Sequence, residues 1–287
     1  MRTVWVLTDR RYLRQRMPLA LIEWLRATGH PPNVVVADDG PKLSLIAPLG
    51  GSSLPSAWSG LGTGDLVVTR SRDAFALALL EDAEARGARA LDSAQAVHRV
   101  RHKATCALGL AHRGLPVPPT LLAGGPDDVA GLAESAFPLV VKPVLGDNAQ
   151  GVRVVATRDE LRAGDWDGQP ILAQSYVEAG GFDVKLYVAG DRIWATRRPG
   201  PLSKLDAPVT RVPVTPELRR IARGCREEFG LKLFGVDVLE SEDGLSIVDV
   251  NEFPNYTGVE DAPAAIGEVV LAEAQLPREA VPAVVPA

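Results

Sequence analysis

Short apolar runs alternate with amphipathic segments along the first third of the chain. Three apolar runs predict strands, at residues 3–8, 33–38 and 65–70. Amphipathic segments at residues 12–29 and 73–87 have the spacing of helices. Strands that alternate with helices are typical of a parallel sheet with right-handed crossovers. We therefore expect an open parallel α/β domain over residues 1–95.

The pattern changes after a helix that is expected to begin near Lys103. A connection rich in Gly and Pro follows it, and strand patterns then recur, one of them a hairpin that turns at Gly190 and Asp191. Residues 215–230 predict a helix, with Thr215 as its N-cap and Gly230 at its end. This part of the chain favours antiparallel strands with fewer helices.

A stripe of polar side chains marks the hairpin predicted over residues 235–253, GVDVLESEDGLSIVDVNEF. A three-residue loop with Gly244 in a left-handed conformation would place Asp237 opposite Asp249. Asn251 then lies on the same face, because side chains along a strand repeat with period two. Two carboxylates and an amide converge there, with no basic residue among them in the hairpin. Oxygen donors around uncompensated negative charge favour Mg²⁺ or Mn²⁺; a slipped register with one Asp in solvent is the alternative.

A second polar feature is the loop that follows the predicted strand ending in Lys142. Its glycines, Gly146 and Gly151, would let backbone N–H groups approach phosphate oxygens beside the Lys142 charge. A plain hairpin with an exposed lysine explains the same pattern. Lys185 lies in the middle of another predicted strand, where a lysine more commonly faces solvent.

Composition and charge narrow the class of protein. The 287 residues carry a net charge of -5, which argues against a nucleic-acid partner. Cys106 and Cys225 lie far apart and form no CxxC pair, so neither a disulfide framework nor a zinc knuckle is indicated. No apolar stretch approaches the ~20 residues that span a membrane. We expect a cytoplasmic enzyme without a membrane partner, and leave open whether it is a homo-oligomer.

Five segments, taken in order, resemble the ATP-grasp superfamily. They are HKATCALGLAHRGLPVPPT, VVKPVLGDNAQGV, AQSYV, DVKLYVAGDRIWATRR and GVDVLESEDGLSIVDVNEFPNYTGV, which together span about residues 103–262. The resemblance implies an α/β fold of the α+β grasp type, with ATP and Mg²⁺ (or Mn²⁺) as cofactors. It divides the chain into the N-terminal domain, a central lobe at 96–175, a C-terminal lobe at 176–275 and a flexible tail at 276–287.

The resemblance implies a phosphate site. Lys103 and Lys142 would contact the ATP phosphates beneath a mobile flap that runs from Gly146 to Gly151. Many members of the superfamily have a glycine in the flap where this chain has Ala149, and this difference is expected to stiffen the flap.

The segment AQSYV would be the hinge strand on which adenine lies. Gln174 and the backbone of Tyr176 and Val177 would read the edge of the base, and Asp183 would lie near the ribose. Ser175 stands where an acidic residue is common.

The catalytic and metal residues follow from the same likeness. Lys185 and Arg198 would lie near the phosphates or the reacting group, and Asp237, Asp249 and Asn251 would hold one or two Mg²⁺ ions. Many members have a Glu in place of Asp249, and an Arg in place of Lys185 is common in ligases that extend proteins or peptides with glutamate.

Two reactions fit this set of residues. A ligase phosphorylates a carboxylate, and an amine then attacks the acyl phosphate to give an amide or peptide bond. A kinase phosphorylates a hydroxyl, and the segments DVNEFPNYTGV and KLYVAGDRIWATRRPGPL resemble the inositol trisphosphate kinases. The ligase is favoured because most superfamily members form carbon–nitrogen bonds. A regulatory protein without turnover is disfavoured, because the metal carboxylates are intact.

Candidate substrate contacts come from two regions. Arg70 and Arg72 stand at the carboxyl end of a parallel strand, where open α/β sheets bind ligands, and either could pair with a carboxylate. Asn255 and Gly258, beyond the metal strand, are expected to form part of the acceptor pocket wall. The partners are therefore expected to be small-molecule or peptide carboxylates and amines.

Overall fold

The computed structural model describes residues 2–39, 58–146, 149–164 and 168–275, and these divide into two compact units. Unit 1 comprises Met1–Leu91 and Pro263–Ala287, and unit 2 comprises Asp92–Ala262. The predicted tail at 276–287, like Asp147 and Asn148 in the predicted flap, lies outside the described residues. Each unit is described by itself.

Unit 1 contains a parallel sheet in the order β2-β1-β3-β4. Its strands are β1 (Val4–Thr8), β2 (Asn33–Val36), β3 (Leu66–Arg70) and β4 (Arg89–Ala90). The helices η1 (Tyr12–Arg14), α1 (Arg16–Ala27) and α2 (Ala74–Ala85) connect them. The single helix predicted over 12–29 is divided, because Met17 has an extended ψ of 134° before Pro18. A proline disfavours the helical conformation in the residue that precedes it.

Helix α8 (Ala262–Gln275) belongs to unit 1 from Pro263 onward, whereas the resemblance assigned these residues to the C-terminal lobe. Gly267 lies against the indole of Trp24 so closely that a Cβ there would be 2.0 Å from a ring carbon. Arg89 forms a salt bridge of 3.1 Å with Glu273. The close approach holds α8 to helix α1, and the ion pair holds it to strand β4.

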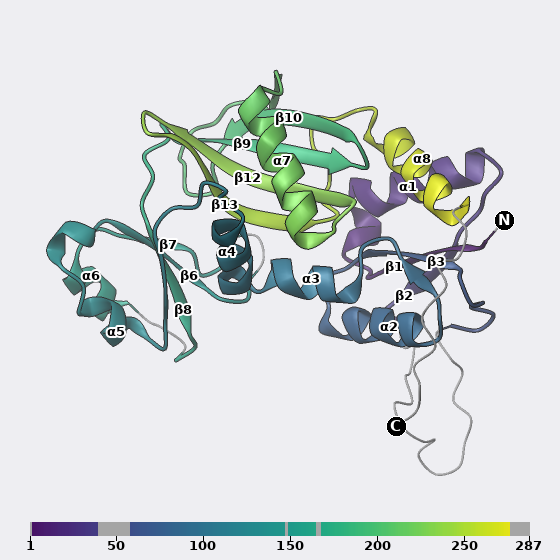
Figure 1. Cartoon of the computed structure of the whole chain (residues 1–287), viewed down its shortest axis with the longest axis horizontal. Helices are drawn as coiled ribbons and strands as arrows, with labels where there is room; N and C mark the ends of the chain where they lie inside the picture. Colours follow the sequence, from purple (N-terminus) through teal and green to yellow (C-terminus); the bar gives the residue numbers. More distant parts are fainter. Residues whose placement is uncertain (1, 40–57, 147–148, 165–167, 276–287) are drawn as a thin grey trace, which may run out of the picture. The chain divides into compact units, whose positions relative to one another are not determined.

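The larger sheet of unit 2 is antiparallel in the order β11-β10-β9-β12-β13. Its strands are β9 (Phe182–Ala189), β10 (Arg192–Pro199), β11 (Thr210–Val212), β12 (Leu233–Ser241) and β13 (Gly244–Glu252). One face packs on a core formed with α3 (Ala94–Arg101), α4 (Lys103–His112) and α7 (Pro216–Phe229), and Figure 1 shows α7 lying across the strands. As predicted, Thr215 caps α7 by accepting from Leu218 N, and Gly230 ends it at a φ of 71°.

The smaller sheet of unit 2 has its own core and runs in the order β5-β8-β6-β7. Its strands are β5 (Thr120–Ala123), β6 (Leu139–Pro143), β7 (Arg153–Val155) and β8 (Ile171–Ser175), accompanied by the short helices α5 (Pro126–Ala130), η3 (Glu134–Ala136) and α6 (Arg158–Ala163). Two sheets with separate cores support two lobes, whose limits at 96–175 and 176–275 stay a prediction. The parallel unit and the two antiparallel sheets confirm the predicted fold class.

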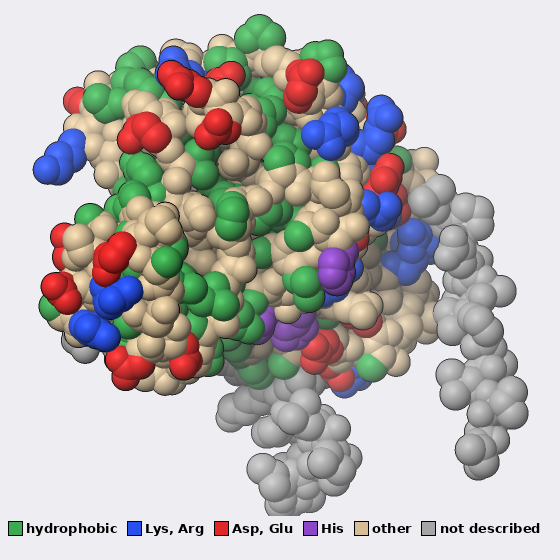
Figure 2. Space-filling model, turned by 60° about the vertical axis from the view of Figure 1, so that its left-hand side comes forward, with side chains coloured by type: hydrophobic (Ala, Val, Ile, Leu, Met, Phe, Trp, Pro, Cys, Tyr) green, Lys and Arg blue, Asp and Glu red, His purple; other side chains and the backbone are tan. Residues whose placement is uncertain are grey.

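Surface charge and helix length are relevant to whether the protein binds nucleic acid or a membrane. On the face drawn in Figure 2, Lys and Arg side chains are interspersed with Asp and Glu, so this face presents no large basic field of the kind that binds nucleic acid. No helix in the described part of the chain is long and apolar enough to cross a membrane.

Candidate active site

The β12–β13 hairpin brings the predicted carboxylates face to face. Asp237 pairs with Asp249, as predicted, but the loop length and the register of the hairpin differ from the prediction. The loop has two residues, so Ser241 pairs with Gly244, and the register shifts by one residue between Asp237 and Val238. A β-bulge at Val248 absorbs the extra residue and restores the pairing of the two Asp residues.

Asp237 is surrounded by cations, so the expectation of uncompensated negative charge was wrong. Lys185, its direct neighbour on β9, donates from Nζ to Asp237 Oδ2 at 2.6 Å. Arg198 Nη2, from β10, donates to Oδ1 of the same carboxylate at 3.2 Å. The Lys185 side chain is only 7% exposed, which also excludes the solvent-facing position that is common for mid-strand lysines.

Asp249 has lysine partners from outside the sheet. Lys103, at the start of α4, donates to both carboxylate oxygens of Asp249, at 3.0 and 3.1 Å. Burial raises the pKa of Asp249, but Lys103, Lys142 and Lys185 outweigh it and leave the pKa below its ordinary value. The carboxylate is therefore held in its charged form.

Lys142 lies at the end of β6 and contacts the backbone of the bulge residue Val248. Its Nζ donates to the Val248 carbonyl at 2.9 Å. Burial lowers the pKa of Lys142 more than the nearby Asp249 raises it. A partly desolvated ammonium beside the carboxylates is suited to bind a phosphate oxygen, which would replace the missing solvation.

Asn251 completes the predicted metal set. Its Nδ2 donates to Asp237 Oδ2 at 3.1 Å and to Asp249 Oδ2 at 3.3 Å. The described residues contain no group of three or more His, Cys, Asp and Glu side chains able to hold a metal. Two carboxylates and one amide nevertheless fit a magnesium ion, which takes hard oxygen ligands and keeps several waters. The donor set is compatible with a divalent cation shared with phosphate.

Two glycines make room for the buried charges. A Cβ on Gly235 would lie 3.0 Å from Lys185 Cε and 3.2 Å from the Leu186 carbonyl oxygen. A Cβ on Gly200 would lie 2.7 Å from Asp183 Oδ1. Burial, and after it the nearby Asp237, raises the pKa of Asp183 to about 6. Asp183 therefore faces the Asp237 cluster, and its predicted place near the ribose stays a prediction.

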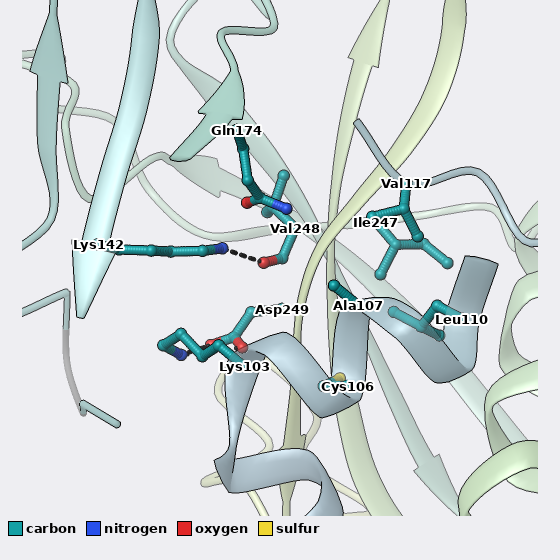
Figure 3. Close-up of a pocket in the computed structure, with 10 residues that line it drawn as sticks. All are labelled: Lys103, Cys106, Ala107, Leu110, Val117, Lys142, Gln174, Ile247, Val248 and Asp249. Carbon is teal, nitrogen blue, oxygen red and sulfur yellow. Dashed lines mark hydrogen bonds and ion pairs between the residues drawn. The ribbon is translucent and has the colours of Figure 1, made fainter. Parts of the chain in front are cut away.

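A pocket connects this cluster to the smaller sheet (Figure 3). Lys103, Lys142 and Asp249 line its charged end, and the side chain of Gln174 points into it from β8. The remaining lining residues are mostly apolar: Cys106, Ala107, Leu110, Val117, Ile247 and Val248. One pocket thus has apolar side chains beside a cationic end.

The predicted hinge and flap flank the smaller sheet. The Tyr176 N–H donates to the Pro138 carbonyl at 3.2 Å, so this backbone donor, predicted to help read adenine, already has a partner. At the flap, Cβ atoms on Gly146 and Gly151 would each lie 3.2 Å from the Pro143 ring. Ala149 has a φ of 57°, a left-handed conformation that favours glycine. The contact of Val177 with adenine stays a prediction.

The candidate substrate residues lie apart in the chain. Asn255 and Gly258 follow β13, and a Cβ on Gly258 would lie 3.0 Å from Val209 Cγ1. Tyr256, between them, is fully buried and donates from its hydroxyl to the Val188 carbonyl at 2.5 Å. Arg70 belongs to unit 1, where its guanidinium stacks on the Tyr12 ring at 4.1 Å.

Gly235 and Thr120 are among the residues of the site that were not predicted. Gly235 stands beside the metal strand, and Thr120 contacts Gln174 from the neighbouring strand β5. A glycine inside a strand indicates a close approach of other atoms, so the sequence contains one signal for Gly235. Thr120 carries no such signal, because its partner depends on the order of the strands.

The sequence matches a known family over residues 100–266, described as the RimK-like ATP-grasp domain. A probable alpha-L-glutamate ligase of Stutzerimonas stutzeri is 32% identical over 203 residues, which are 65% of this chain and 67% of that relative.

Solved structures share the fold. The RimK domain ATP-grasp protein of Sphaerobacter thermophilus superposes with a TM-score of 0.72 at 23% identity, over 94% of this chain and 98% of that one. The ATP-grasp ligase PsnB, complexed with a minimal precursor, Mg and ADP, has a TM-score of 0.69 at 19% identity, over 95% and 98%.

These matches decide between the two reactions that the sequence left open. The Stutzerimonas relative and PsnB are both named as ligases, and enzymes of this kind use ATP with a divalent metal on small-molecule or peptide substrates. ATP-dependent formation of an amide or peptide bond is supported, and no match among them points to a kinase. The chain belongs to the RimK-like ATP-grasp family of carboxylate–amine ligases.

Proposed function

We propose that the protein uses Mg-ATP to activate a carboxylate as an acyl phosphate, at the cluster around Asp237 and Asp249, and joins it to an amine. The observation that carries this assignment is one connected set of charges in unit 2. Its members are the cations Lys103, Lys142, Lys185 and Arg198 and the carboxylates Asp183, Asp237 and Asp249.

The ion pairs of the cluster could be replaced by contacts with a bound nucleotide and metal ion. Lys103 and Lys185 each donate to an Asp. Triphosphate oxygens would compete for the ammonium groups, while the carboxylates would turn to a divalent cation. Mg²⁺ held by Asp237, Asp249 and Asn251 would neutralise charge on the phosphates.

The chemical steps require stabilisation of moving negative charge. An oxygen of the substrate carboxylate attacks the γ-phosphorus, and ADP leaves. The amine nitrogen then attacks the acyl carbon, phosphate leaves, and the nitrogen loses a proton. We assign Lys185 and Arg198 to the stabilisation of the transferring phosphoryl group, because preorganised cations in a water-poor site stabilise such charge best. Lys103 and Lys142 hold the nucleotide phosphates.

The relatives suggest the first substrates to examine. Their name, probable alpha-L-glutamate ligase, makes L-glutamate the first amine to test. A peptide carboxylate is the first acceptor class, since PsnB was solved with a precursor. Asn255 and Gly258 would form part of the acceptor wall.

Hydroxylamine distinguishes the proposed reaction from its alternative. The enzyme is incubated with Mg-ATP and candidate carboxylates, with hydroxylamine in place of the amine, and hydroxamate is measured against ADP. An acyl phosphate gives one hydroxamate for each ADP. ADP formed together with a phosphorylated alcohol, and without hydroxamate, would contradict the proposal.

A matched pair of variants connects the chemistry to the site. Asp249→Asn keeps the shape of the side chain but removes the charge that pairs with Lys103. Asp243→Asn makes the same change in the exposed turn of the same hairpin. We expect turnover to fall at least ~100-fold in the first variant and to remain at the wild-type level in the second.

A further inference from the structure

Gln174 is held by a neighbour on the next strand. Its side chain lines the pocket and only 3% of the residue is exposed. Thr120 lies directly opposite Gln174 in the β5–β8 register. The Gln174 Nε2 donates to Thr120 Oγ1 at 2.8 Å.

The Thr120 hydroxyl has no second proton to give. Its Oγ1 lies 2.7 Å from the carbonyl oxygen of Pro118, a group that can only accept, so the hydroxyl proton is used there. Toward Gln174 the oxygen can therefore only accept. The amide must present its NH₂ to Thr120, and its Oε1 must point the other way.

The orientation leaves a defined acceptor in the pocket. No hydrogen bond to Gln174 Oε1 occurs within the described part of the chain, and this oxygen is not among the buried atoms cut off from solvent. Apolar side chains of Leu110, Val117 and Ile247 line the same pocket. An acceptor among apolar walls is satisfied by a ligand N–H and is disfavoured opposite a ligand oxygen.

The geometry points to Thr120 as a positioning residue that sets the base preference of the nucleotide site by fixing the Gln174 amide. A purine with an amino group at position six would donate to Oε1, whereas a purine with an oxo group there would oppose it. The inference rests on the proposed function, in which this pocket holds the nucleotide base.

The test measures binding of nucleotides by calorimetry, with Mg²⁺ and without acceptor. The ligands are ATP, GTP and purine riboside triphosphate, which has no group at position six. Thr120→Val keeps the shape and the β-branch on an exposed strand position but removes the hydroxyl, so the amide can turn. We expect the preference for ATP over GTP to fall about 3- to 10-fold, as for loss of one neutral hydrogen bond. Thr120→Ser should keep it, and purine riboside triphosphate should bind both variants alike.

A second set of variants, made in Gln174→Ala protein, distinguishes the positioning of Gln174 by Thr120 from a general effect of Thr120 on the pocket. In Gln174→Ala, the additional change Thr120→Val should leave the ATP-to-GTP ratio unaltered, because the group that it orients is gone. The inference is overturned if Thr120→Val retains the wild-type ratio, or if it lowers the ratio equally in the Gln174→Ala background. If wild-type protein binds no nucleotide, the proposed function itself fails, which the wild-type titration reveals first.

Discussion

Lys185 and Asp237 lie directly opposite each other on β9 and β12, and their side chains meet at 2.6 Å beneath the surface. The pair joins two strands of the larger sheet at the point where Asp237 also faces Asp249. A cation is thus built into the row of residues that we propose to bind metal. The charge that balances Asp237 comes from the sheet itself, whereas Lys103 on α4 balances Asp249.

Replacement of Lys185 with Met should destabilise the fold and reduce turnover. Removal of one partner from a fully buried pair costs ~3–5 kcal/mol. We expect about 1–3 kcal/mol here, because Arg198 still contacts Asp237. Urea unfolding measures the change, with the exposed Lys204→Met as control. Equal unfolding free energies for Lys185→Met and wild type would show that the pair contributes nothing.

Gly235→Ala should disturb the site through Lys185. The new Cβ would lie 3.0 Å from Lys185 Cε and is confined by Pro254 and the backbone of β9. Overpacking of this kind costs about 1–3 kcal/mol, and displacement of the ammonium should lower kcat more than it raises the Kd for ATP. Gly125→Ala, where a Cβ meets nothing within 4 Å, is the matched control. Unchanged kcat in Gly235→Ala would contradict the role given to Lys185.

Tyr256→Phe should loosen the segment that carries Asn255. The hydroxyl donates to the Val188 carbonyl inside the protein, so its loss removes a buried hydrogen bond at a cost of about 0.5–1.5 kcal/mol. We also expect a higher KM for the acceptor, measured with ATP saturating. Tyr176→Phe, at an exposed side chain, should change neither quantity. An equal change in KM in both variants would contradict the proposed role of Asn255 in acceptor binding.

Asp92 should give the stability a distinctive pH dependence. Burial raises its pKa from 3.8 to about 7, against two backbone hydrogen bonds from Lys232 and Leu233 that lower it, and with Glu252 also raising it. Between pH 4 and 7 the folded state keeps a proton that the unfolded state loses. The free energy of unfolding should therefore fall as pH rises through this window, by at most ~1.4 kcal/mol per pH unit.

Asp92→Asn removes that titration. The difference in unfolding free energy between wild type and variant should change steadily from pH 4 to 7 and become constant above pH 7. A difference that is constant over the whole range would mean that Asp92 titrates at its ordinary value in the folded protein.

Local patterns predicted most of the strands, the capped helix α7 and the facing pair Asp237–Asp249, but not the short strands β4, β5 and β11. The predicted register between the loop and the Asp pair was wrong, because alternation of apolar and polar residues does not reveal a bulge. Ser241 pairs with Gly244, and the extra residue at Val248 restores the pairing. The bulge also accounts for a contact that no pattern indicates, the hydrogen bond from Lys142 to the Val248 carbonyl.

Contacts between distant strands could not be predicted in the same way. Lys185 and Asp237 are 52 residues apart, and Thr120 and Gln174 are 54 apart. Which residues face each other at such separations depends on strand order, which is set by the packing of the whole sheet. The hairpin alone therefore suggested carboxylates without a cation, and β9 supplies one.

Transfer of oxygen from the carboxylate to phosphate tests the central claim most directly. The carboxylate that supports ADP formation is prepared with ¹⁸O in both oxygens, and the inorganic phosphate released with Mg-ATP and the amine is analysed by mass spectrometry. An acyl-phosphate ligase places one ¹⁸O in each phosphate formed. Release of unlabelled phosphate, or transfer of the phosphoryl group to a hydroxyl without release, would contradict the proposed reaction.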